Sequence, residues 1–223
     1  MNELAPFKPE ERIIEYLLKD PSKARLIKMN LVEFADETAS ESPAPGGGSI
    51  SAYVGALGVS LGTMVANLSS HKQGGDDRWK EFSDWAEKGQ HYKSELLKMV
   101  DEDTNAFNKI MTAFGFPKST DEEKKIRSQA IQEATKYATE VPFKVMQLCY
   151  DSMEVIKAMA ETGNPNSVTD AGVGALCART AVMGAYLNVK INAAGLSDKE
   201  FAKKIIDNGK AIEDKAQSLE AEI

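Results

Sequence analysis

Apolar residues along this chain recur at intervals of three and four, the period of an α-helix, and runs of strict apolar–polar alternation are missing. Glycine and proline clusters and the capping motifs Thr120-x-x-Glu123 and Ser197-x-x-Glu200 divide this pattern into segments. Pro142 lies inside one segment and is expected to kink or divide its helix. The helices predicted in this way cover about residues 10–19, 30–40 (with Asn30 as N-cap), 50–69, 76–114, the stretch between Thr120 and a turn at Gly163, 167–193, and a charged stretch after Ser197.

Two of these segments, residues 50–68 and 167–193, carry almost no charge. The first is close to the length of a membrane span. However, its small residues recur at spacings of four, three and four, which places them on one helix face and lets another helix approach closely. They are Ser51, Gly55, Gly58 and Gly62. The pattern therefore predicts a buried helix rather than a membrane span, and an all-α fold. We expect residues 1–223 to form one helical bundle around these two apolar helices, with N-terminal helices in residues 1–42.

Charge and cysteine content narrow the function classes. The chain has 27 Lys and Arg against 34 Asp and Glu, a formal net charge of −7, which argues against nucleic acid or an anionic membrane surface as the main partner. Cys149 and Cys177 lie in apolar helical segments without metal-ligand spacing, so no metal site is expected. The N-terminus is charged throughout and lacks an apolar signal core, and a cytoplasmic location is expected.

A glycine triplet, Pro45-Gly46-Gly47-Gly48-Ser49, opens the first apolar helix. Glycine lets a ligand approach the backbone closely, and the first N–H groups of a helix have no intrahelical partner. This helix start therefore suits an anionic or carbonyl-bearing ligand.

A carboxylate interrupts the apolar stripe of the segment around residues 96–114. Asp103 occupies the gap in that stripe, and burial would raise its pKa towards the range of a general acid or base. The alternative is an interior carboxylate that Arg179 or backbone donors satisfy. Asp101 is turned to the other side and is expected on a solvated face. The apolar positions of the stripe are Leu96, Val100, Phe107, Ile110 and Phe114.

Further polar residues gather at and along the second apolar helix. Residues 163–170 place amides, hydroxyls and one carboxylate at its start, where they could cap the helix or bind a ligand. Arg179 is the only charge between Asp170 and Lys190, and it could bind a substrate carboxylate or neutralise a buried acid. Asn188 and Asn192 share a helix face and could bind a heterocycle or bridge helices.

Five short motifs follow one another between residues 43 and 192: 45–49, 64–68, 100–107, 163–172 and 184–192. The ordered set resembles the cyclodeaminase domain of formiminotransferase-cyclodeaminase and its stand-alone relatives, the bacterial methenyltetrahydrofolate cyclohydrolases. The resemblance implies an all-helical homodimer, a tetrahydrofolate substrate, no metal or redox cofactor, and Asp103 as the catalytic acid. The substrate-binding residues expected with it are Gly46, Gly47, Gly48, Ser49, Asn67, Asn164, Asp170 and Asn188.

Two reactions remain open. Residues 4–17 resemble the junction between transferase and cyclodeaminase in the bifunctional enzyme, which favours a formimidoyltetrahydrofolate cyclodeaminase acting beside a separate formiminotransferase in histidine breakdown. The alternative is a methenyltetrahydrofolate cyclohydrolase. A non-enzymatic alternative is a dimeric helical scaffold, in which Asp103 is fully paired and faces no cavity. The enzyme hypothesis instead predicts one pocket that holds Asp103 and the backbone of residues 46–49 together.

Overall fold

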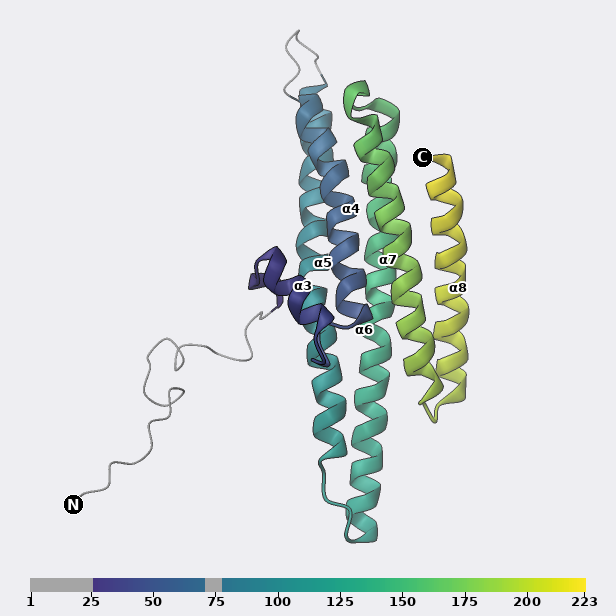
Figure 1. Ribbon diagram of the computed structural model, residues 1–223. Helices are drawn as coiled ribbons and strands as arrows, with labels where there is room; N and C mark the ends of the chain where they lie inside the picture. Colours follow the sequence, from purple (N-terminus) through teal and green to yellow (C-terminus); the bar gives the residue numbers. More distant parts are fainter. Residues whose placement is uncertain (1–25, 71–77) are drawn as a thin grey trace, which may run out of the picture.

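The computed structural model describes residues 26–70 and 78–223, and these residues form helices with no strand among them. The expected helix at 10–19 and the junction-like segment at 4–17 lie outside the described residues. The all-α prediction is confirmed (Figure 1). The elements are η1 (Leu26–Lys28), α3 (Leu31–Ala39), α4 (Gly47–Ser70), α5 (Trp79–Phe114), α6 (Asp121–Thr162), η2 (Pro165–Ser167), α7 (Val168–Ala194) and α8 (Lys199–Glu222).

The two apolar helices, α4 and α7, run antiparallel and pack against each other. A Cβ atom on Gly58 would lie 2.8 Å from the carbonyl oxygen of Gly174, so the two backbones approach too closely for a larger side chain. A Cβ atom on Gly55 would lie 2.3 Å from the Cys149 Sγ, and one on Gly62 would lie 3.1 Å from the Ile156 Cγ1, so these two glycines pack against side chains of α6. The predicted small-residue face is therefore a packing face. Among the described residues, α4 is the one helix long and apolar enough for a membrane span, but most of that window is buried inside the bundle.

The N-terminal elements lie across α4 and α5. Asn30 caps α3 as predicted, accepting a hydrogen bond from the Glu33 N–H. The ring of Phe34 in α3 packs 5.3 Å from that of Tyr53 in α4. The expectation that Asp101 is solvated is wrong. Its side chain is half-buried, and its Oδ1 accepts a 2.8 Å hydrogen bond from the Leu26 N–H, which ties η1 to α5.

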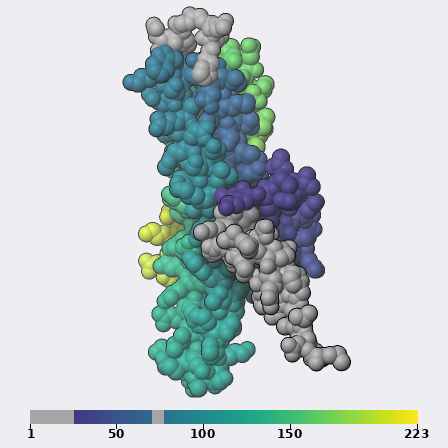
Figure 2. Space-filling model, turned by 90° about the vertical axis from the view of Figure 1, so that its left-hand side faces the viewer, coloured from purple at the N-terminus to yellow at the C-terminus, as the bar shows by residue number. Residues whose placement is uncertain are grey.

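The ends of α5 and α6 form a hairpin that extends past α4 and α7 (Figure 1), and Figure 2 shows its tip as the lower end of the molecule. Because few elements cover this end, Phe107 and Phe114 are 39% and 49% exposed, and the predicted apolar stripe leaves the core there. The predicted capping box of Thr120 and Glu123 opens α6.

Two local predictions about helix boundaries need correction. The helix α6 runs through Pro142 without division. The N-cap of α8 is Asp198 rather than Ser197, because the Asp198 carboxylate accepts the Phe201 N–H. Ser197 instead donates to Gln132 of α6.

Candidate active site

Asp103 of α5 meets the N-terminus of α4. Its Oδ2 accepts hydrogen bonds from the Ser49 N–H, at 2.9 Å, and from the Ser49 hydroxyl, at 3.0 Å. Ser49 is buried and lies in the first turn of α4, whose N–H groups have no intrahelical partner. The helix start therefore holds the carboxylate in place through its main chain and its dipole.

The glycine triplet lets Asp103 approach this helix start. A Cβ atom on Gly48 would lie 2.0 Å from Asp103 Oδ1, which no side chain can occupy. A Cβ atom on Gly47 would lie 3.3 Å from the Asn188 amide nitrogen of α7. Glycine is thus required at position 48 by close approach of the acid.

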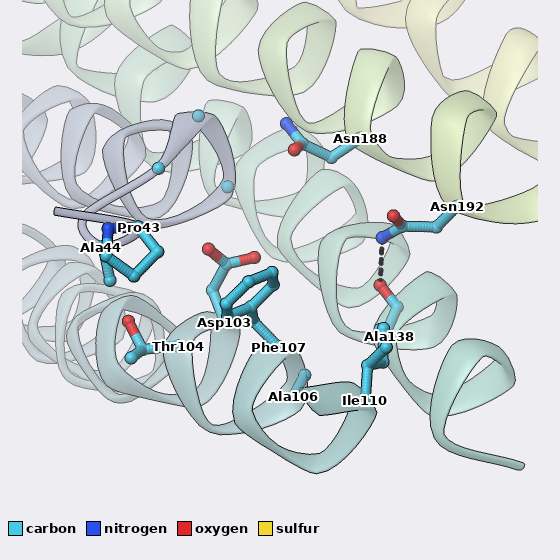
Figure 3. A pocket seen from close by; sticks show the side chains of 13 residues that line it. Pro43, Ala44, Asp103, Thr104, Ala106, Phe107, Ile110, Ala138, Asn188 and Asn192 are labelled. Carbon is cyan, nitrogen blue, oxygen red and sulfur yellow. Dashed lines mark hydrogen bonds between the residues drawn. The ribbon is translucent and has the colours of Figure 1, made fainter. Parts of the chain in front are cut away.

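A cavity of about 150 Å³ opens beside Asp103 between α4, α5, α6 and α7. In Figure 3 the carboxylate points into the space between the α4 start and Asn188. Asn192 donates a 2.6 Å hydrogen bond to the Ala138 carbonyl and so bridges α7 to α6. Thr104 carries a buried hydroxyl oxygen without a hydrogen-bond partner among the described residues. The lining residues are Pro43, Ala44, Gly46, Gly47, Gly48, Asp103, Thr104, Ala106, Phe107, Ile110, Ala138, Asn188 and Asn192.

The surroundings of Asp103 raise its pKa. Burial disfavours the charged form and is the largest influence, while the two hydrogen bonds from Ser49 favour the carboxylate and partly offset it. Among the described residues, no basic side chain forms an ion pair with Asp103. The pKa therefore moves from its ordinary value towards neutrality, which helps a group that must both give and take a proton.

The raised pKa predicts how stability depends on pH. Between the unfolded and folded pKa values the folded chain binds more protons at Asp103, so the stability contributed by this group falls as pH rises through the folded pKa. We expect Asp103→Asn to melt at a higher temperature than wild type at about pH 8 and the gap to narrow at lower pH. Thermal unfolding followed by circular dichroism over this range measures the gap. A variant less stable than wild type at about pH 8 would contradict the burial argument.

Three predicted site residues lie elsewhere in the chain. Asn67 is 20 residues along α4 from Gly47, about 30 Å at the rise of an α-helix. Asn164 lies at the same far end, where its N–H donates to Ser69 Oγ at 2.7 Å. Asp170 is half-buried in the first turn of α7. The structure therefore brings Gly46, Gly47, Gly48, Ser49 and Asn188 to Asp103, and does not bring Asn67, Asn164 and Asp170 there within one chain.

Arg179 does not pair with Asp103, the buried acid that the sequence suggested for it. Its Nη1 lies 3.0 Å from Glu220 Oε2 of α8, so it joins α7 to α8 on the other side of the bundle from Asp103. The scaffold hypothesis required a fully paired Asp103 that faces no cavity. Asp103 instead lines a pocket together with the backbone of the glycine triplet, as the enzyme hypothesis expects.

Sequence reasoning missed part of the pocket. Ala138 contributes its carbonyl oxygen, and a main-chain group leaves no signal in the sequence. Thr104 directly follows Asp103 in the sequence. This position beside the predicted acid is the signal that could have identified Thr104 as a pocket residue. Pro43 and Ala44 lie between two predicted helices, directly before the glycine triplet, and they form one edge of the pocket.

Comparison with known proteins agrees with this geometry. Residues 30–211 match the family model for formiminotransferase-cyclodeaminase. The methenyltetrahydrofolate cyclohydrolase of Methylorubrum extorquens is 40% identical over 171 residues, which cover 77% of this chain and 82% of that protein. The formimidoyltransferase-cyclodeaminase of Rattus norvegicus is 35% identical over 205 residues, 92% of this chain and 38% of the rat protein. The chain thus spans about two fifths of the rat enzyme.

A solved structure has the same fold. The formiminotetrahydrofolate cyclodeaminase of Thermotoga maritima superposes with a TM-score of 0.77 at 29% identity, covering 88% of this chain and 94% of that one. This chain belongs to the formiminotransferase-cyclodeaminase family. Its relatives carry the names of folate cyclodeaminases and of a folate cyclohydrolase, so the family alone leaves the reaction to be assigned.

Proposed function

We propose that this protein is a formimidoyltetrahydrofolate cyclodeaminase in which Asp103 is the general acid and base. The observation that carries the proposal is the acid itself: a carboxyl of raised pKa, held by a helix N-terminus, at the wall of a pocket. Its relatives' names supply the class of substrate, a tetrahydrofolate that carries a one-carbon unit.

The reaction needs one proton carried between two nitrogens. N10 of 5-formiminotetrahydrofolate attacks the carbon of the formimino group, whose imino nitrogen is protonated, and a tetrahedral carbon forms between N5 and N10. Asp103 takes the proton from N10 and gives it to the exocyclic amine. The carbon–nitrogen bond to that amine then breaks, ammonia leaves, and 5,10-methenyltetrahydrofolate remains. Because proton transfer alone balances these steps, the proposal includes no metal or redox cofactor.

A second candidate is the cyclohydrolase reaction, and the 40% identity to the Methylorubrum enzyme favours it. Water adds to the methenyl carbon, and Asp103 moves one proton from that water to N5. The carbon–N5 bond then breaks, the remaining hydroxyl releases its proton to solvent as it becomes the formyl carbonyl, and 10-formyltetrahydrofolate is formed. Both reactions pass through a tetrahedral carbon between two nitrogens. The same acid could therefore serve either.

Assays with the two substrates separate the candidates. Absorbance of the methenyl chromophore should rise when purified protein is given 5-formiminotetrahydrofolate and ammonia should appear in equal amount. A fall with 5,10-methenyltetrahydrofolate, without the first reaction, would assign the cyclohydrolase instead. No turnover of either substrate would overturn the proposal as a whole.

We also propose that the protein acts as a homodimer built on the outer faces of α4 and α7. The exposed large apolar side chains of each helix recur at helical spacings and so share one side of that helix, and exposed apolar surface of this kind is typical of a protein interface. The cavity of about 150 Å³ is also small, since pockets for ligands of folate size measure about 300–1,000 Å³. The exposed apolar residues are Leu57, Met64 and Leu68 of α4 and Val173, Leu176, Leu187 and Ile191 of α7.

A two-fold axis across this face would also bring the predicted site residues that lie far apart in one chain close together across the dimer. Leu57 lies halfway along α4 between Gly47 and Asn67, and Arg179 lies halfway along α7 between Asp170 and Asn188. The two midpoints lie at one level, because Gly58 packs against the backbone of residues 174–178. A single axis at this level would set Asn67 and Asp170 of one copy opposite Gly47 and Asn188 of the other.

The dimer proposal predicts the effect of a charge on this face. Leu176→Glu should give a monomer by light scattering and lose turnover, because a buried unpaired carboxylate opposes association. Ile126→Glu on the hairpin tip is the matched control, since Ile126 is 53% exposed and Leu176 51%. The control should remain dimeric and active. A Leu176→Glu protein that stays dimeric would show that the interface lies elsewhere.

The wider setting follows from the relatives. The rat relative's name joins a transferase to a cyclodeaminase. We propose that a formiminotransferase supplies the substrate of this protein, in the cytoplasm.

A further inference from the structure

A second cavity, of about 360 Å³, lies between α4 and α5 at the end of α4 remote from Asp103. Among the described residues that line it, Lys93 supplies the one charge, Asn67 and Gln90 supply side-chain amides, and none supplies a carboxylate. An ammonium with two amides is a suitable set of groups for a carboxylate ligand. The lining residues are Ser60, Thr63, Met64, Asn67, Leu68, Gln90 and Lys93.

The ammonium of Lys93 is available for such a ligand. Its side chain is half-buried, and its Nζ contacts the Gln90 amide oxygen. No carboxylate among the described residues pairs with it. Two other lysines of α5 are already committed, since Lys98 pairs with Glu95 at 2.5 Å and Lys88 with Glu154 at 2.7 Å. In a chain of net charge −7, a half-buried lysine that meets no acid in residues 26–70 and 78–223 needs an explanation.

The position of this cavity suits the dimer better than the single chain. Within one chain, α3 crosses α4 at Tyr53, between the Asp103 cavity at residues 46–48 and the Lys93 cavity at residues 60–68. Across the two-fold axis proposed above, Asn67 of one copy faces Gly47 of the other. The Lys93 cavity of each copy would then adjoin the Asp103 cavity of its partner.

We propose that the substrate spans these two cavities, with its one-carbon unit at Asp103 of one copy and its glutamyl carboxylate on Lys93 of the other. This inference rests on the proposed function and dimer. A tetrahydrofolate carries its reacting nitrogens on the pterin side and its carboxylates at the opposite end. Lys93 is then a specificity residue for the anionic tail and takes no part in the proton transfer.

Kinetics of one variant with two substrates test the role of Lys93. Lys93→Met should raise KM about ten-fold or more and change kcat little, because a charge-assisted bond to the bound substrate is lost. The same reaction with a substrate whose aminobenzoyl group ends in a primary amide in place of glutamate should show equal KM for variant and wild type. Lys98→Met is the matched control on the same helix and should leave both KM values as they are.

A mixed dimer tests whether the two residues act across the interface. Asp103→Asn and Lys93→Met chains, carrying different affinity tags, are co-expressed and the heterodimer is purified through both tags. If Lys93 acts in the partner's site, one site of the heterodimer holds both native residues. The heterodimer should then show wild-type KM with half of the wild-type kcat.

The possible results distinguish failure of the Lys93 role from failure of the proposed function. Wild-type protein that turns over neither folate overturns the proposed function. Active wild type with unchanged KM in Lys93→Met overturns the tail-binding role, as does an equal rise in KM for the substrate without glutamate. A heterodimer with the high KM of Lys93→Met places both residues in one chain's site and overturns the contribution across the interface.

Discussion

Replacing Asp103 with asparagine is expected to lower kcat about a thousand-fold, within the range by which a positioned general acid or base accelerates a reaction. The amide cannot carry a proton between the two nitrogens. Its oxygen can still accept the two hydrogen bonds that Ser49 donates to the carboxylate. Helicity by circular dichroism and mass by light scattering should therefore match wild type, and initial rates with the preferred folate measure the loss.

Glu102→Gln is the matched control for this variant. Glu102 precedes Asp103 on α5, and its carboxylate accepts a hydrogen bond from the Tyr137 hydroxyl rather than facing the pocket. The control loses the same charge from the same turn of helix and should keep most of its turnover. Asp103→Asn protein with wild-type kcat would exclude Asp103 as the proton carrier and return the pocket to a binding role.

Replacing Gly48 with alanine is expected to lower kcat about a hundred-fold, although Asp103 itself stays unchanged in sequence. The new Cβ would fall 2.0 Å from Asp103 Oδ1 and 2.5 Å from its Cγ, so the carboxylate must move away from the start of α4. A displacement of about 1 Å at a reacting group can cost this much in rate. The pKa of Asp103 should rise further, because the Ser49 hydrogen bonds that favour its charged form are weakened.

Gly195→Ala separates this effect from a general cost of losing a glycine. A Cβ at Gly195 meets its nearest atoms at 3.5 and 3.6 Å, an ordinary contact, and the residue lies at the C-terminus of α7. This control should keep wild-type kcat and melting temperature. Full activity in Gly48→Ala would mean that the acid works from another position than the one observed.

The helical pattern predicted the fold well because each signal acts locally. Asn30 and Thr120 each form a capping hydrogen bond with the residue three positions later. The packing role of Gly58 follows from the helical spacing of the small residues around it in α4. Ser197 failed as a cap because Asp198, one residue later, offers a carboxylate to the same helix start. Pro142 failed as a divider because packing holds α6 together across it.

The site was predicted less completely, because it depends on contacts between residues that are far apart in the sequence. Asp103 was found because it interrupts an apolar stripe, and the glycine triplet because it opens a helix. Nothing in the sequence tells that Asp101 binds the Leu26 N–H or that Arg179 pairs with Glu220, since both partners come from other helices. Asn67, Asn164 and Asp170 are expected at the site from the family resemblance, and the order of the motifs along the chain does not give their distances from Asp103.

The way Ser49 holds Asp103 has a consequence for the order in which the site can assemble during folding. The two residues belong to α4 and α5, which are neighbours in sequence, so packing these two helices against each other is enough to join the acid to its helix start. Contacts between sequence neighbours close with a smaller loss of chain entropy than distant ones. Asn188 and Asn192 belong to α7 and complete the wall only when that helix docks. The hydrogen bonds between Ser49 and Asp103 can thus form first, and the part of the pocket wall that α7 contributes forms afterwards.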